Sequence, residues 1–137
     1  MAGQPPSVFA RELAAVNRHP QRPRDWWYVA YDQLSDSHGA WSEQPNATGI
    51  VLIECPSKAG RRPYHQQKLA TVLTSLRHFA LEQARRGVLV RHLVANTDYA
   101  SALREVTDEL GPVSMWTPAE RELRVELAPL VDAGRLR

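Results

Sequence analysis

Residues 49–96, GIVLIECPSKAGRRPYHQQKLATVLTSLRHFALEQARRGVLVRHLVAN, carry the clearest indication of the fold. It opens with GIVLIEC (49–55), a continuous apolar run typical of a strand buried on both faces. From Pro63 the apolar residues recur every three or four positions, which predicts a long amphipathic helix ending at Gly87. VLVRHLVAN (88–96) follows at once as another strand. A strand, a helix and a strand in this order predict a parallel β–α–β unit.

The same alternation continues on both sides of this unit. DWWYVAYD (25–32) predicts a strand buried on both faces at the centre of the sheet, and PVSMWT (112–117) predicts a shorter last strand. TDYASALREVTDELG (97–111) is helical and stops at Gly111, whereas QLSDSHGAWSEQPNATG (33–49) is loop-like with one short helical turn. The sequence therefore predicts an α/β fold, a doubly wound (Rossmann-like) parallel sheet of four strands with helices on both faces.

The two ends of the chain complete the domain assignment. PPSVFARELAAVNR (5–18) suits a short amphipathic helix that HPQRPR breaks, so residues 1–24 are interpreted as an N-terminal helix and linker, and 25–137 as one α/β domain. In TPAERELRVELAPLVDAG (117–134), Thr117 can cap a helix, Pro118 takes its first position and Glu120 completes a capping box. Because this helix ends where another strand would follow, we expect a domain truncated before a further part of its parent protein.

Composition limits the classes of function. The 137 residues include 17 Lys and Arg and 15 Asp and Glu, a net charge of +2 that is spread along the chain and does not indicate a DNA-binding face. Cys55 is the single cysteine, which excludes an internal disulfide and a thiolate-bound metal or iron–sulfur site built from this chain alone. No apolar run has the length of a membrane span and the start does not resemble a secretory signal. We therefore expect a cytoplasmic location and no membrane partner.

Candidate ligand-binding residues follow the ends of the predicted strands. In open parallel sheets, ligands bind outside the carboxyl ends of the strands, near the point where the strand order reverses. Polar residues stand at three such ends: Tyr31, Asp32 and Gln33 after the first strand, Glu54, Cys55 and Ser57 after the second, and Thr117, Glu120 and Arg121 after the last. Together they could surround a polar, ring-bearing small molecule.

A structural role is the alternative for each of these residues. Asp32 could form a turn as readily as bind a ligand. Glu54, at a buried strand end, needs a cation or hydrogen-bond donor, and Arg61 or Arg62 could supply one as a purely structural ion pair. Cys55 is expected to be packing rather than a nucleophile, and His92 a satisfied strand histidine.

Known catalytic and nucleotide-binding motifs do not match. YDQLSDSHG, after the first strand, is neither a dinucleotide fingerprint nor a phosphate-binding loop. There is no nucleophile elbow and no hydrolytic carboxylate pair, and His65 and His78 are too far apart in sequence for a helical metal pair. We assign no catalytic and no metal-binding residues.

RRPYHQQK (61–68) is unusual for the start of a helix. A helix N-terminus already carries a partial positive charge, so Arg61, Arg62 and Lys68 are unfavourably placed there unless an anion or polar ligand approaches.

Three motifs together resemble one family. YDQLS (31–35), the stretch from Gly49 to Leu93 and TPAERELRVEL (117–127) are similar to the N-terminal domain of deoxyribodipyrimidine photolyase-related proteins, the bacterial iron–sulfur cryptochromes and photolyases. The similarity runs from about Trp27 to about Val131. DQLS and KLATVLTSLRHFALE (68–82) are its most specific parts.

The resemblance implies a protein of two halves. The N-terminal α/β domain would cradle an antenna chromophore, a ribityl lumazine or a flavin, while a C-terminal helical domain would hold FAD, an iron–sulfur cluster and damaged DNA. By this analogy Tyr31, Asp32, Gln33 and Leu34, with Glu54, would line the chromophore pocket. Lys58 and Arg61 stand where relatives carry an acid and an aromatic residue, so they would face either a more anionic antenna, such as a flavin phosphate, or the helical domain.

Three functions therefore stay open at the level of sequence. The first is an antenna domain of a photolyase-like flavoprotein that repairs DNA or senses blue light, in which this part alone is no enzyme. The second is a docking domain without a ligand. The third is a free-standing nucleotide-binding protein of similar topology.

Overall fold

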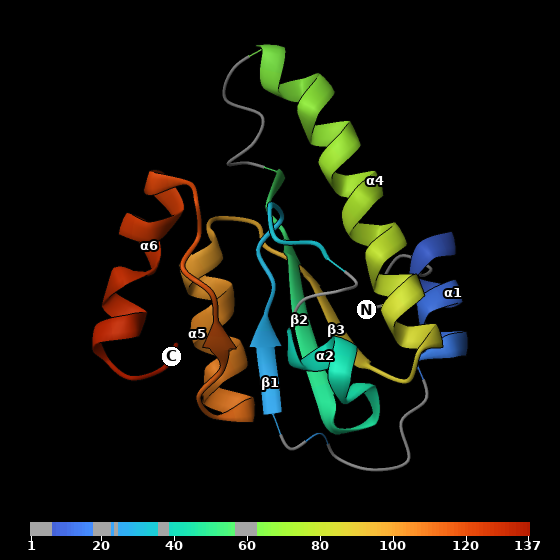
Figure 1. Cartoon of the computed structure of the whole chain (residues 1–137). Helices are drawn as coiled ribbons and strands as arrows, with labels where there is room; N and C mark the ends of the chain where they lie inside the picture. The colour runs from blue at the N-terminus through green and yellow to red at the C-terminus, as the bar shows by residue number, and fades with distance from the viewer. Residues whose placement is uncertain (1–6, 18–22, 24, 36–38, 57–62) are drawn as a thin grey trace, which may run out of the picture.

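The structure, a computed structural model, describes residues 7–17, 23, 25–35, 39–56 and 63–137, and of residues 63–69 only the backbone. The elements in chain order are α1 (Val8–Val16), β1 (Asp25–Tyr28), α2 (Ala40–Glu43), the 3₁₀ helix η1 (Pro45–Ala47), β2 (Thr48–Glu54), α4 (Pro63–Arg85), β3 (Leu89–Val94), α5 (Tyr99–Leu110), β4 (Ser114–Met115) and α6 (Arg121–Asp132). Figure 1 shows the strands side by side between two groups of helices.

The sheet is fully parallel and has the strand order β3-β2-β1-β4. This confirms the predicted α/β fold with a Rossmann-like sheet. The chain then returns to the sheet beyond β4, where Leu136 pairs in parallel with Val113. Two backbone hydrogen bonds flank this contact, from the Val113 N–H to the Arg135 carbonyl at 2.9 Å and from the Arg137 N–H to the Val113 carbonyl at 3.0 Å.

Both faces of the sheet carry a core, as the uninterrupted apolar run of β2 predicts. All seven residues of β2 are buried. Because side chains alternate along a strand, Val51 and Ile53 join the core beneath α5 and α6, whereas Ile50 and Leu52 join the core beneath α1 and α4. The two helix groups lie on opposite sides of the sheet in Figure 1.

The central strand is shorter than its sequence run. β1 lies between β2 and β4, as predicted, and Tyr28 with the following Val29 and Ala30 is buried. Asp25 is exposed and Trp26 and Trp27 are only half-buried, so the expectation of burial on both faces is wrong for the first three residues of the strand. In the described chain, Asp25 and Trp26 lack a strand neighbour on the β4 side, because β4 pairs only with Trp27 and Tyr28.

Helix termination follows the glycines. Gly87, after α4, has φ +101° and Gly111, the C-cap of α5, has φ +84°, a backbone region that only glycine enters at little cost. Both helices end where the sequence predicts.

The capping box predicted at Thr117 is wrong. Helix α6 begins at Arg121, its N-cap is Glu120, and no side chain caps it. The Arg124 guanidinium instead donates to the carbonyls of Pro118 and Ala119 at 2.8 and 2.6 Å, which holds this segment outside the helix. Pro118 is buried rather than at the first helical position.

In the described part of the chain, no helix combines the length and the apolar character that crossing a membrane requires.

Candidate functional site

The strand order places a switch point between β1 and β4. β2 and β3 lie on one side of β1 and β4 on the other, so the connections leaving β1 and β4 diverge at their carboxyl ends. Ligands of doubly wound proteins bind at such a divergence. Residues 29–34 leave β1 here and residues 116–120 leave β4. We call these two segments the switch-point rim.

Gln33 joins the two segments of the rim. Its amide Nε2 donates to the carbonyls of Trp116 and Thr117 at 3.4 and 3.2 Å, and its Oε1 accepts the backbone N–H of Ala30 at 3.4 Å. The structure therefore brings together Gln33 and Thr117, which are 84 residues apart in sequence. Because both ends of the Gln33 amide are engaged, this residue positions the rim.

Tyr31 and Asp32 lie in a turn that the Gln33 N–H closes on the Ala30 carbonyl at 2.8 Å. The Asp32 side chain is exposed, in a position that suits both the turn role and the ligand role considered from sequence. Tyr31 is half-buried, and its ring centroid lies 6.4 Å from that of Tyr99 at the start of α5. The phenol and the carboxylate leave the same turn, where they could act on one ligand.

The other end of the rim contributes Thr117 and Glu120, both exposed. Partial burial raises the pKa of Glu120, and the neighbouring carboxylates of Glu122 and Glu126 raise it further. Asp32 and Glu120 supply carboxylate oxygens to the described part of the rim, and these oxygens can accept hydrogen bonds from hydroxyl or N–H groups.

Glu54 is enclosed by partners that the sequence did not reveal. The Arg77 guanidinium of α4 donates two hydrogen bonds to the Glu54 carboxylate, from Nε to Oε1 at 2.7 Å and from Nη2 to Oε2 at 3.1 Å. His92 Nε2 of β3 lies 3.1 Å from Oε1, but it is buried and has no hydrogen-bond partner among the described residues. Burial acts to raise the pKa of Glu54, but the neighbouring His92 and the hydrogen-bonded Arg77 guanidinium outweigh it and lower that pKa to about 2.

This arrangement bears on the predicted ion pair. The proposed partners Arg61 and Arg62, together with Lys58, lie outside the described residues, and Arg77 occupies the role of cation at Glu54. The Glu54 carboxylate, 2% exposed, is committed to an internal ion pair. This carboxylate can contact a ligand only if the side chain of Arg77 or His92 moves away from it.

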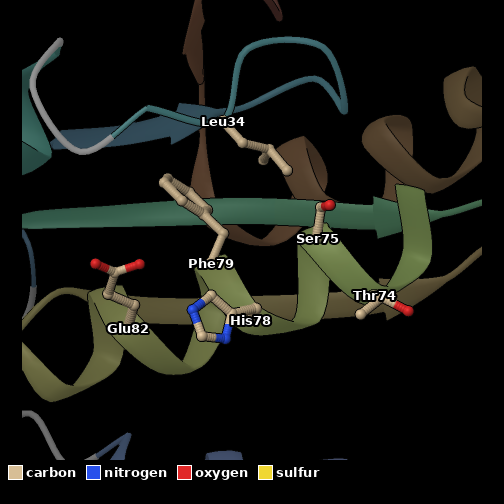
Figure 2. Close-up of a pocket in the computed structure, with 6 residues that line it drawn as sticks. All are labelled: Leu34, Thr74, Ser75, His78, Phe79 and Glu82. Carbon is tan, nitrogen blue, oxygen red and sulfur yellow. The ribbon is translucent and has the colours of Figure 1, made fainter. Parts of the chain in front are cut away.

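Leu34 lies beside a shallow hollow of about 380 Å³ against α4. Figure 2 shows Leu34 and Phe79 together at its apolar side, with Ser75, His78 and Glu82 along the helix. The hollow is on the α4 face of the sheet, whereas Tyr31 packs toward α5. The four predicted residues 31–34 therefore do not all lie on one surface, because Tyr31 and Leu34 face opposite sides of the sheet.

Two groups of residues near the rim were missed from sequence. One is a partly buried polar group around Tyr28 and Tyr99, the pKa values of which are raised mainly by burial and also by the Glu126 carboxylate and the Cys55 thiol. Glu126 accepts the N–H groups of Tyr99 and Ala100 at 2.8 and 3.1 Å, at the first turn of α5. The aromatic and acidic composition of these segments was visible, but their meeting depends on the fold.

The other group is a cluster of three tryptophans. Trp116, 37% exposed, directly precedes Thr117, and its ring centroid lies 5.4 Å from Trp41 and 6.0 Å from Trp27. Trp27 and Trp41 are 5.9 Å apart. The Trp41 indole N–H donates to the Ser35 carbonyl at 2.9 Å, which ties the cluster to the segment that follows β1.

The described residues include no group of three or more side chains able to hold a metal ion. Fold and rim together define a class, the α/β proteins with a doubly wound parallel sheet and a polar rim at its switch point. A family model gives the narrower assignment. The model described as deoxyribodipyrimidine photo-lyase-related protein matches residues 27–137, and the chain belongs to this family. No curated protein is significantly similar to the chain.

Proposed function

We propose that the chain is the antenna-binding domain of an iron–sulfur cryptochrome or photolyase, a flavoprotein of light-driven DNA repair or blue-light sensing. The observation that carries the proposal is the coincidence of two facts. The chain belongs to the photolyase-related family, and the segments leaving β1 and β4 are joined by Gln33 into a polar rim at the ligand-binding position of this fold.

The chemistry of the rim suits a ribityl lumazine or a flavin. Such ligands combine a planar ring with a chain of hydroxyl groups. Tyr31 offers a ring and a phenol, and Asp32 and Glu120 offer carboxylate acceptors for hydroxyls. These carboxylates favour the hydroxyl-bearing part of the ligand at the rim, and a phosphate group would require the cations of Lys58 or Arg61.

In this proposal the chain's own residues bind and orient an absorber. When bound, the antenna supplies absorption of visible light, whereas FAD and the iron–sulfur cluster belong to a C-terminal helical domain of the parent protein, as does contact with damaged DNA. Gln33 holds the rim in one arrangement, Tyr31 limits access of water to the ring, and Asp32 fixes the hydroxyl chain.

The test is an absorption titration of the purified chain with a ribityl lumazine and, separately, with riboflavin. We expect a saturable change in the visible spectrum. Replacing Asp32→Ala removes a charged hydrogen-bond acceptor and should weaken binding about tenfold, the effect of losing about 1.4 kcal/mol. Asp132→Ala, an exposed aspartate at the end of α6, is the matched control and should bind like wild type.

A docking domain without a ligand is the second candidate, and α6 favours it. Val125 and Val131 of α6 are 64% and 49% exposed, while Leu123, Leu127 and Leu130 face the core. An exposed apolar helix face can dock a partner domain. A chain that ignores both ligands but binds its separately produced helical domain, with binding lost in Val125→Asp, would favour docking over the antenna.

A further inference from the structure

Trp116 is an exposed aromatic side chain on the switch-point rim. Among the described residues, five large apolar side chains are exposed, which are Trp116 at 37% and four valines of α1, β3 and α6. Trp116 is the one aromatic ring of this group, and it directly follows β4 on the rim. Single exposed valines are common on protein surfaces, whereas an exposed indole leaves a large apolar area in water at a cost in free energy. Its position therefore needs an explanation.

Both the backbone and the ring of Trp116 are held in place. Its carbonyl accepts a hydrogen bond from the Gln33 amide at 3.4 Å. Its ring centroid lies 5.4 Å from that of Trp41 and 6.0 Å from that of Trp27, with interplanar angles of 50° and 68°. Because both angles are far from parallel, neither neighbouring indole covers a face of the Trp116 ring by flat stacking.

The support behind Trp116 is itself fixed. Trp41 is 1% exposed, and its indole N–H donates to the Ser35 carbonyl at 2.9 Å. The backbone of Gly39 packs so closely on the Trp41 ring that a Cβ atom there would come within 2.5 Å of it. Trp27 closes the cluster at 5.9 Å from Trp41. A ring that stacks on Trp116 would therefore meet a preorganised surface, which lowers the entropy lost on binding.

The tryptophan cluster gives the rim a second aromatic side. Trp27 and Trp41 belong to the core beneath α1 and α4, whereas Tyr31 packs against the core beneath α5 and α6. We propose that Trp116 is the surface on which the planar ring of the rim ligand stacks, so that the site selects an extended heteroaromatic ring. This inference rests on the proposed function and adds the residue that recognises the ring, while Asp32 recognises the hydroxyl chain.

A small ligand suits this surface better than a protein partner does. The exposed apolar group at the rim is a single indole, and the other exposed large apolar residues of the described chain are valines on α1, β3 and α6. A protein interface needs an area far larger than one side chain. One planar ring, in contrast, gains most of its contact from one aromatic surface.

Two flavins separate recognition of the ring from recognition of the chain. Riboflavin carries an isoalloxazine ring and a ribityl chain, whereas lumiflavin carries the same ring with a methyl group in place of the chain. In fluorescence titrations, Trp116→Leu should weaken binding of both flavins about tenfold. Trp116→Phe keeps an aromatic ring and should weaken both less. Asp32→Ala should weaken riboflavin but not lumiflavin. Trp26→Phe, on the opposite core, is the matched control and should bind both like wild type.

Flavin fluorescence at saturation distinguishes stacking from a purely structural role of Trp116. An indole in contact with the isoalloxazine ring quenches the emission of the flavin. Saturated with lumiflavin, the wild-type chain and Trp26→Phe should therefore emit less than Trp116→Leu. If Trp116 only supported the fold, the bound ring would be quenched equally in all three proteins. Circular dichroism verifies that each variant is folded.

The outcomes separate this inference from the proposed function. Wild-type binding that Trp116→Leu leaves unchanged in affinity and quenching would overturn the stacking role and leave the antenna proposal standing. Lumiflavin binding that depends on Trp116, with riboflavin bound no more tightly, would support stacking and contradict the role given to Asp32. A wild-type chain that binds neither flavin overturns both proposals, and an equal loss of binding in Trp26→Phe overturns the stacking role.

Discussion

At the scale of single residues, Glu54 shows what the fold adds to the sequence. A carboxylate at the end of a fully buried strand must have a partner, and this requirement could be predicted. The identity of the partner could not, because Arg77 lies 23 positions later, three turns or more into α4. The nearer arginines in RRPYHQQK were the natural hypothesis. Which arginine meets a carboxylate depends on the angle at which the helix crosses the sheet.

Arg77→Leu tests the strength of this ion pair. The substitution leaves the buried Glu54 carboxylate with His92 alone, and since the Arg77 side chain is itself 43% exposed we expect a loss of about 2 kcal/mol in the free energy of unfolding. Urea denaturation measures it. Arg91→Leu is the control, because its partner Glu109 is exposed and the loss should stay below about 1 kcal/mol. Equal losses in the two variants would show that Glu54 does not depend on Arg77.

Glu54 should also make stability depend on acid pH. Its pKa is about 2 in the folded chain and about 4.5 without the fold, so the unfolded state takes up the proton first as the pH falls. The stabilisation is therefore complete above about pH 4.5 and is lost progressively toward pH 2. Urea unfolding across this range should show a smaller loss of stability in Glu54→Gln than in wild type. A parallel decline in both proteins would contradict this assignment.

At the scale of elements, periodicity was sufficient for most of the fold. The apolar run of β2, the three-and-four spacing in α4 and the glycines after α4 and α5 are local signals, and all four gave elements where expected. The capping box at Thr117 was also a local signal, yet α6 starts later because Arg124 and the buried Pro118 hold the preceding segment. Hydrogen bonds from a residue only five and six positions further along the chain therefore decided where α6 begins.

The start of α5 is held by another element, which no local pattern reveals. Asp98 caps it through the Ser101 N–H at 2.7 Å, and Glu126 of α6 accepts the N–H groups of Tyr99 and Ala100. Asp98→Ala should cost about 1 kcal/mol, the value of an ordinary N-cap. Glu126→Ala should cost about 2 kcal/mol, because it leaves two partly buried donors unpaired and breaks a link between helices.

Thermal unfolding compares these two variants, with the exposed Glu105→Ala of α5 as the control. A larger loss of stability in Asp98→Ala than in Glu126→Ala would mean that α5 is capped locally and does not rely on α6.

At the scale of the whole molecule, the strand order decides where a ligand can bind. The sequence predicted four parallel strands, and from the general rule for such sheets it also predicted that the segments after the first and last strands share one edge. The structure joins these segments through Gln33. The structure places Leu34 and Tyr31 on opposite faces of the sheet and encloses Glu54. Neither result could be predicted from sequence, because each depends on the path of the loops and helices. The tryptophan cluster could not be predicted from sequence either, because its members come from three segments that are far apart along the chain.

The antenna proposal therefore depends on the rim at the switch point and not on the hollow against α4. The most direct measurement is a map of backbone amide chemical shifts in the isotopically labelled chain during titration with a ribityl lumazine. We predict that the largest saturable shifts occur at Tyr31, Asp32, Gln33 and Thr117. Shifts confined to Ser75, His78 and Glu82, or no saturable shifts at all, would contradict the account.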